Sequence, residues 1–150
     1  MGGNNNHLNW GISSRIFGEN AERCAMKINV LLVEDEAVSA LAMDLTLKAM
    51  GYTTCRSAAS GKKALEILLL EKPDVVLMDI NLTGHLDGIE IARKMQELGH
   101  TAIIFMTGYS ADDVLDRARE LNPAAILVKP INPNQLKAAI DAAVKNNRIL

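Results

Sequence analysis

The sequence predicts an α/β protein in which five helices cover both faces of a doubly wound, five-stranded parallel sheet. The first observation is a set of short apolar runs without polar alternation, which is typical of strands buried on both faces. The second is that each run is followed by a segment whose apolar residues recur at helical spacing. Right-handed crossovers leave few topologies for this alternation, and we expect the common strand order 2-1-3-4-5.

The expected strands are short, and most end at a polar or charged residue. We expect them at about residues 28–33, 52–56, 75–79, 102–106 and 125–128. Pro73 ends the helix before the third strand, because proline cannot continue a helix. With the expected strand order, this alternation is the flavodoxin-like arrangement.

The expected helices begin at residues that cap helix N-termini. We expect them at about residues 36–50, 60–71, 87–98, 110–121 and 132–144. Ser60, Asp87, Ser110 and Asn132 supply a side-chain oxygen at four of the starts, and Gly51 ends the first helix. That first helix also carries an apolar stripe at the spacing of a core-facing side. The members of the stripe are Val38, Leu41, Ala42, Leu45 and Ala49.

Length and composition narrow the class of protein. The 150 residues suit one domain, and a hydrophobic share of 49% is enough for a core. A net charge of −2 gives no electrostatic footprint for nucleic acid or an anionic membrane. The two cysteines, Cys24 and Cys55, form no metal-ligand spacing, and no apolar run approaches membrane-spanning length. We therefore expect a soluble cytoplasmic protein with no membrane partner.

The N-terminal residues differ in composition from the rest of the chain. Residues 1–26 open with a polar Gly/Asn-rich run and sustain no apolar periodicity. We expect them to form a flexible extension ahead of a single domain at 27–150, because such segments cannot offset the entropy of ordering. Their origin is left open.

Chemistry-bearing side chains follow four of the expected strands. Glu34 and Asp35 follow the first strand, Asp79 ends the third, Thr107 follows the fourth and Lys129 the fifth. The carboxyl ends of parallel strands meet at one edge of the sheet, where ligands bind in such folds. Taken singly, Asp79 could merely cap a turn and Lys129 could be a solvated surface residue. Together, in this order, they predict a site.

The predicted site suits phosphoryl transfer. Three nearby carboxylates repel one another unless a cation intervenes. Oxygen ligands without Cys or His favour Mg²⁺. A carboxylate nucleophile, a metal, the hydroxyl of Thr107 and the ammonium of Lys129 can together accept a phosphoryl group and hold its oxygens.

Here the sequence resembles the receiver domain of two-component response regulators, over residues 27 to 144. The resemblance rests on residues 30–36 (VLLVEDE), 76–79 (VLMD), 87–88 (DG), 104–108 (IFMTG) and 128–130 (VKP). It implies that Asp79 is the phosphoacceptor. It also implies that Glu34, Asp35, Asp79 and the main-chain carbonyl of Asn81 hold Mg²⁺. Thr107 and Lys129 would each bind a phosphoryl oxygen, and the bond before Pro130 would be cis.

The sequence departs from the family pattern at two places. Many receivers have a proline shortly after the phosphoacceptor and a loop one residue shorter than residues 81–87. An aromatic residue usually stands three positions before the strand-five lysine, where this chain has Ile126. The run Thr107-Gly108-Tyr109 is similar to a receiver subgroup that has Thr-Gly-Tyr at this place and lacks the aromatic residue in strand five. We therefore expect Thr107, Tyr109 and Ile126 to be the switch positions, with Tyr109 reporting phosphorylation.

The resemblance implies partners as well as a site. A histidine kinase or histidine phosphotransfer protein would supply the phosphoryl group. A downstream protein would read the face formed by the fourth helix, fifth strand and fifth helix. We see no DNA-binding domain in this chain, so we expect its output to go through protein contact. The resemblance implies a phosphoacceptor switch that catalyses only its own phosphorylation and dephosphorylation, rather than an enzyme. Whether it pairs with a second copy, and whether it is a full-length regulator or a fragment, is left open.

Two other classes compete with this interpretation. One is a phosphatase with an aspartate nucleophile, of the haloacid dehalogenase type. Those enzymes carry a second Asp two residues after the nucleophile, where this chain has Asn81. The other is a flavodoxin-like cofactor binder, but the acidic turn at 34–36 would repel a phosphate unless a metal bridged it.

Overall fold

The computed structural model describes residues 27–54, 56–82, 87–99, 101–108 and 111–148. Five parallel strands form one sheet in the order β2-β1-β3-β4-β5, which confirms the predicted topology. The strands are β1 (Asn29–Val33), β2 (Thr53–Thr54), β3 (Val75–Asp79), β4 (Ala102–Thr107) and β5 (Ala125–Val128). β2 is shorter than the predicted 52–56; beyond it, an isolated bridge joins Val33 to Ala58. The predicted N-terminal extension at 1–26 lies outside the described residues.

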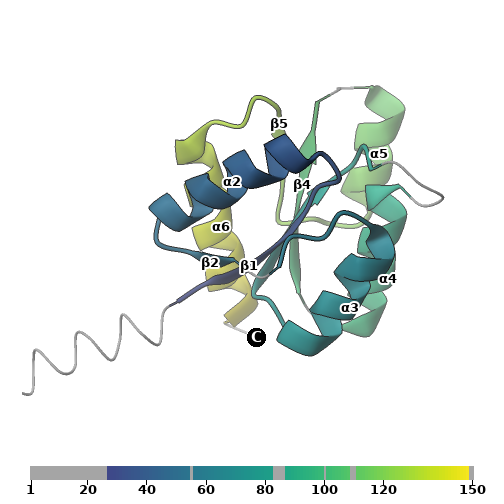
Figure 1. The fold of residues 1–150 in the computed structure, drawn as a ribbon. Coiled ribbons are helices and arrows are strands. Elements are labelled where there is room, and N and C mark those ends of the chain that lie inside the picture. The colour runs from purple at the N-terminus through teal and green to yellow at the C-terminus, as the bar shows by residue number, and fades with distance from the viewer. Residues whose placement is uncertain (1–26, 55, 83–86, 100, 109–110, 149–150) are drawn as a thin grey trace, which may run out of the picture.

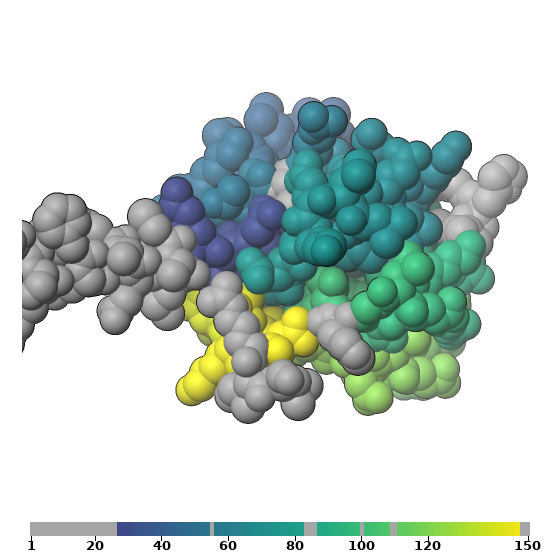
Figure 2. All heavy atoms as spheres, turned by 90° about the horizontal axis from the view of Figure 1, so that it is seen from below, coloured from purple at the N-terminus to yellow at the C-terminus, as the bar shows by residue number. Residues whose placement is uncertain are grey.

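Five helices cover the two faces of the sheet. They are α2 (Ala37–Ala49), α3 (Gly61–Glu71), α4 (Gly88–Leu98), α5 (Asp112–Glu120) and α6 (Pro133–Arg148). α2 and α6 lie on one face, and α3, α4 and α5 lie on the other (Figure 1). The view from below shows the teal-to-green atoms of α3, α4 and α5 gathered on the side away from the yellow end of α6 (Figure 2).

β1, β3, β4 and β5 contribute side chains to both cores, because successive side chains of a strand point to opposite faces. In β1, Leu31 and Val33 enter the core beneath α3, α4 and α5, while Val30 and Leu32 enter the core beneath α2 and α6. All five residues of β3 are buried. This two-sided burial is the reason that the strands read as continuous apolar runs.

Three of the four predicted helix caps are present. Ser60 accepts a hydrogen bond from the N–H of Lys63, and Asp87 accepts one from Glu90. Asn132 accepts from two main-chain N–H groups at the start of α6. The predicted cap of the fourth helix is wrong: α5 begins at Asp112, its N-cap is Ala111 without a side-chain cap, and Ser110 lies outside the described residues.

The predicted core-facing stripe of α2 is also wrong. Val38, Leu41 and Leu45 are exposed, with Leu41 61% accessible, and Leu47 is the one residue of α2 that is fully buried. The side that faces the sheet carries Leu47 with the half-buried Met43. This helix has apolar residues around most of its circumference, so spacing alone does not say which side packs. Within the described residues, no helix has both the length and the apolar character needed to cross a membrane.

Candidate functional site

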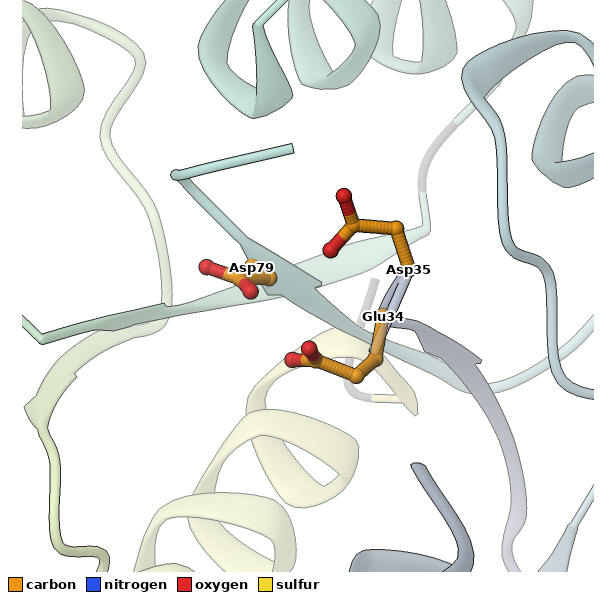
Figure 3. A group of neighbouring side chains, drawn as sticks. All are labelled: Glu34, Asp35 and Asp79. Atoms are coloured by element: carbon orange, nitrogen blue, oxygen red, sulfur yellow. The ribbon is translucent and has the colours of Figure 1, made fainter. Parts of the chain in front are cut away.

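The predicted site residues meet at the carboxyl edge of the sheet. Glu34 and Asp35 directly follow β1, Asp79 ends β3, and Lys129 follows β5. The three acidic side chains gather around the end of β3 (Figure 3). The parallel strand order produces this convergence, because β1 and β5 lie on either side of the central β3–β4 pair.

The carboxylates form a compact acidic cluster. One oxygen from each of Glu34, Asp35 and Asp79 lies within 4.8 Å of the others. Glu34 is only 4% exposed and Asp79 only 3% exposed, whereas Asp35 is half-buried. Buried like charges at this separation are costly, so the site favours a cation. The cluster offers only hard oxygen donors, and this donor set fits Mg²⁺.

Lys129 bridges the two buried carboxylates. Its Nζ donates to Asp79 Oδ2 at 3.1 Å and to Glu34 Oε2 at 3.2 Å. Burial lowers the pKa of the Lys129 ammonium, but the carboxylates of Asp79 and Glu34 outweigh this effect and hold the pKa above its ordinary value. The ammonium is therefore a fixed positive charge beside Asp79.

The pKa of Glu34 is raised as well, but for a carboxyl group this disfavours the charged form. Burial raises the pKa of its carboxyl, and the neighbouring Asp79 raises it further, while Lys129 partly opposes both. The carboxylate also accepts the N–H of Glu36 at 3.2 Å. Its ionised form is thus disfavoured until more positive charge enters the cluster.

Main-chain contacts orient Asp79. The N–H of Asn81 donates to Asp79 Oδ1 at 2.9 Å, so both carboxylate oxygens of Asp79 accept a hydrogen bond. Asn81 therefore lies beside the cluster, and the ligand role of its carbonyl stays a prediction. Thr107 is fully buried at the end of β4, and its carbonyl accepts the N–H of Lys129 at 2.8 Å. The Lys129–Pro130 bond is cis, as expected.

Gly88 is a positioning residue whose role was not predicted. A Cβ at this position would lie 2.1 Å from the carbonyl oxygen of Asp79, which is closer than any side chain tolerates. The N–H of Gly88 also donates to the carbonyl of Ile80. The start of α4 is therefore packed directly on the main chain of Asp79. The sequence signal was the pair Asp87-Gly88, which by itself reads as a helix cap.

Of the predicted switch positions Tyr109 and Ile126, the structure describes only Ile126. Tyr109 lies outside the described residues, so its predicted role stays a prediction. Ile126 is half-buried in β5 and packs against the core beneath α3, α4 and α5. It pairs with Phe105 rather than with Thr107, whose partner in β5 is Val128.

A groove leads from the acidic cluster along α2. It has a volume of about 360 Å³ and separates α2 from the connection between β5 and α6. Glu34 and Lys129 line the groove together with mostly apolar side chains. The walls include Ser39, Met43 and Thr46 from α2, and Pro130, Ile131 and Pro133 from the opposite side. Sequence reasoning missed this groove, because it depends on how two distant segments pack.

Comparisons with known proteins agree on one family. The family model described as "Response regulator receiver domain" matches residues 30–141. Transcriptional regulatory protein PdtaR of Mycobacterium tuberculosis is 35% identical over 124 residues, which cover 83% of this chain and 60% of that protein. Sporulation initiation phosphotransferase F of Bacillus subtilis is 31% identical over 116 residues, which cover 77% of this chain and 92% of that protein.

Solved structures show the same fold. The signal receiver domain of a modulated diguanylate cyclase from Desulfovibrio desulfuricans superposes with a TM-score of 0.78 at 30% identity, covering 82% of this chain and 98% of that one. The matched family does not support the haloacid dehalogenase alternative. The chain spans only 60% of the length of PdtaR, so that protein's full activity does not transfer with the match.

Proposed function

Because the chain belongs to the response regulator receiver family, we propose that it is a phosphoacceptor of two-component signalling and that Asp79 takes the phosphoryl group. The observation that carries the proposal is the position of Asp79 itself. It is a buried carboxylate at a strand end, held by Lys129 on one oxygen and by the N–H of Asn81 on the other.

The reaction that fits this geometry is an in-line transfer from a phosphohistidine. A carboxylate oxygen of Asp79 attacks phosphorus, the bond from phosphorus to the histidine nitrogen breaks, and an aspartyl phosphate forms. Lys129 and Thr107 would hold phosphoryl oxygens. Glu34, Asp35, Asp79 and the carbonyl of Asn81 would hold Mg²⁺, which neutralises charge on those oxygens. The chain would act on no substrate other than its own acyl phosphate.

The surface beside the site supports a protein as the donor. The exposed stripe of Val38, Leu41 and Leu45 lies on the helix that begins next to the acidic cluster, and the groove along that helix adjoins it. Contiguous exposed apolar surface is typical of a protein-interaction site. A histidine kinase or phosphotransfer protein that brings its phosphohistidine to Asp79 would cover this stripe.

Output would use another face. The family resemblance assigns it to α5, β5 and α6, where Val128 is exposed at the end of β5. Phosphorylation beside Thr107 would then shift the start of α5. A cytoplasmic location and the identity of the downstream partner stay predictions.

Incubation with a small phosphodonor and Mg²⁺ tests the proposal. We expect an acyl phosphate to form on the protein. No acyl phosphate should form when the labelling is done with a chelator in place of Mg²⁺. Sustained release of free phosphate from an unrelated phosphomonoester would instead support the phosphatase class. A protein that gains no phosphate with donor and Mg²⁺ would refute the proposal.

A further inference from the structure

Asp87 makes two contacts with its two carboxylate oxygens. Oδ1 accepts the N–H of Glu90 at 2.9 Å and so caps α4. Oδ2 accepts Nη2 of Arg117, which lies on α5, also at 2.9 Å. One side chain therefore fixes the start of one helix and binds a second helix 30 residues further along the chain.

Asp87 is tied closely to the phosphoacceptor segment. Its neighbour Gly88 packs on the carbonyl of Asp79 and donates to the carbonyl of Ile80. The main chain at residues 79 and 80 is therefore in direct contact with Gly88, and Asp87 is one peptide bond further along. This contact is the path by which a displacement at residues 79 and 80 would reach Asp87.

α5 is held by few apolar contacts. Among its described residues only Ala118 is fully buried, and its N-cap supplies no side-chain oxygen. Two polar contacts join the C-terminal part of α5 to the two ends of α4: Arg117 pairs with Asp87, and Gln96 Nε2 donates to the carbonyl of Leu121 at 2.7 Å. A helix with so little buried surface is one whose position a single ion pair can bias.

We propose that the Asp87–Arg117 pair is a latch through which the main chain beside Asp79 sets the position of α5. The inference rests on the proposed function, because it assigns a regulatory role at the phosphorylation site. The latch is a second route to α5, distinct from the one that starts at Thr107. The raised pKa of Arg117, caused mainly by its hydrogen bond to Asp87, agrees with a persistent pair.

The expected effect is modest and reciprocal. The Arg117 side chain is 44% exposed and that of Asp87 35%, so the pair biases the position of α5 on the order of two- to fivefold. If α5 and the phosphorylation site are coupled, the factor by which phosphorylation shifts α5 equals the factor by which α5 shifts phosphorylation. Weakening the latch should therefore change both.

The test compares variants of one helix. Arg117→Gln removes the cation, and Asp87→Asn weakens the pair while keeping a good N-cap oxygen. Arg119→Gln is the matched control, because the ion pair of Arg119 among the described residues is with Asp116, inside α5 itself. The readout is hydrogen exchange of the α5 amides in the unphosphorylated full chain, with α4 amides as the internal reference.

We expect Arg117→Gln and Asp87→Asn each to speed α5 exchange on the order of two- to fivefold. Arg119→Gln should leave it unchanged, and the double variant should be no faster than either single one, since both remove the same contact. Equal exchange in Arg117→Gln and Arg119→Gln, or additive effects in the double variant, would overturn the latch.

The rate of Asp79 labelling by a small phosphodonor is measured in the same variants, and we expect it to change on the order of two- to fivefold in Arg117→Gln and Asp87→Asn but not in Arg119→Gln. Faster exchange of α5 with unchanged labelling would overturn the latch, because the pair would then act on α5 alone. Failure of the wild type to take a phosphoryl group would instead refute the proposed function.

Discussion

α2 and α4 both begin just beyond a strand that ends in the acidic cluster, yet they relate to the core in opposite ways. α4 fully buries Ile89, Ile91 and Met95 and packs its first residue on Asp79. α2 fully buries only Leu47 and exposes a continuous apolar stripe. The difference teaches that helical apolar spacing shows that a helix packs on something, without showing whether that partner is the protein's own core. α4 is an anchor of the site, and α2 is a surface beside it.

The largest difference should appear in stability. Ile89→Ala in α4 should lower the free energy of unfolding by about 2–5 kcal/mol, because it leaves a cavity in a fully buried position. Leu41→Ala in α2 should change it by less than about 0.5 kcal/mol, because Leu41 is largely in solvent. Urea unfolding of both variants measures the contrast. Similar losses would mean that α2 packs as α4 does.

The anchoring role of α4 can be tested at its first residue. Gly88→Ala should cost about 1–3 kcal/mol of stability through overpacking against Asp79, and labelling of Asp79 should fall sharply. Gly99→Ala is the matched control, since nothing lies within 4 Å of a Cβ built there. Thermal unfolding and phosphodonor labelling of the two variants give the result. Normal labelling of a folded Gly88→Ala protein would show that the contact does not position Asp79.

The carboxylates of Glu34, Asp35 and Asp79, which lie just before the start of α2, repel one another, and Mg²⁺ should relieve this repulsion. Saturating Mg²⁺ should raise the melting temperature, because the ion binds the folded chain. Asp35→Asn should be more stable than the wild type without metal, by about 1 kcal/mol at most for a half-buried charge, and should lose the response to Mg²⁺. An unchanged response in that variant would remove Asp35 from the metal site.

The stripe of α2 should matter for transfer and hardly at all for stability. Leu41→Ser combined with Leu45→Ser should leave labelling by a small phosphodonor unchanged, because neither residue lies at the acidic cluster. Transfer from a phosphorylated histidine-containing protein should fall about tenfold or more if the stripe forms the centre of that interface. The matched control is Leu69→Ser on α3, a leucine exposed to a similar degree, 58%, on a helix of the opposite face. An equal effect of the control would argue against docking on α2.

The sequence predicted what depends on strand direction and could not predict what depends on packing between distant segments. Parallel strands bring Asp79, Thr107 and Lys129 to one edge wherever the helices lie, so that convergence follows from the chain order. The choice of packed side in α2 does not follow, because both of its sides are apolar. Two polar contacts of the structure join residues that are far apart in the chain: Lys129 with Glu34, and Asp87 with Arg117. Local sequence patterns do not predict such contacts.

The boundaries that differed have local causes. β2 is an edge strand of two residues that pairs with β1 on one side only, so a longer strand would gain few additional contacts. α5 starts later than the predicted Ser110 cap, at Asp112, and two acidic residues in its first turn stabilise the positive end of the helix dipole.

The most direct test of the proposed function is the location of the phosphoryl group. Wild-type protein and Asp79→Asn are incubated with a small phosphodonor and Mg²⁺, and the intact masses are measured. The wild type should gain the mass of one phosphoryl group and lose it in mild base, as an acyl phosphate does, while Asp79→Asn should gain none. Labelling of Asp79→Asn to the same extent as the wild type would contradict the assignment of Asp79 as the phosphoacceptor.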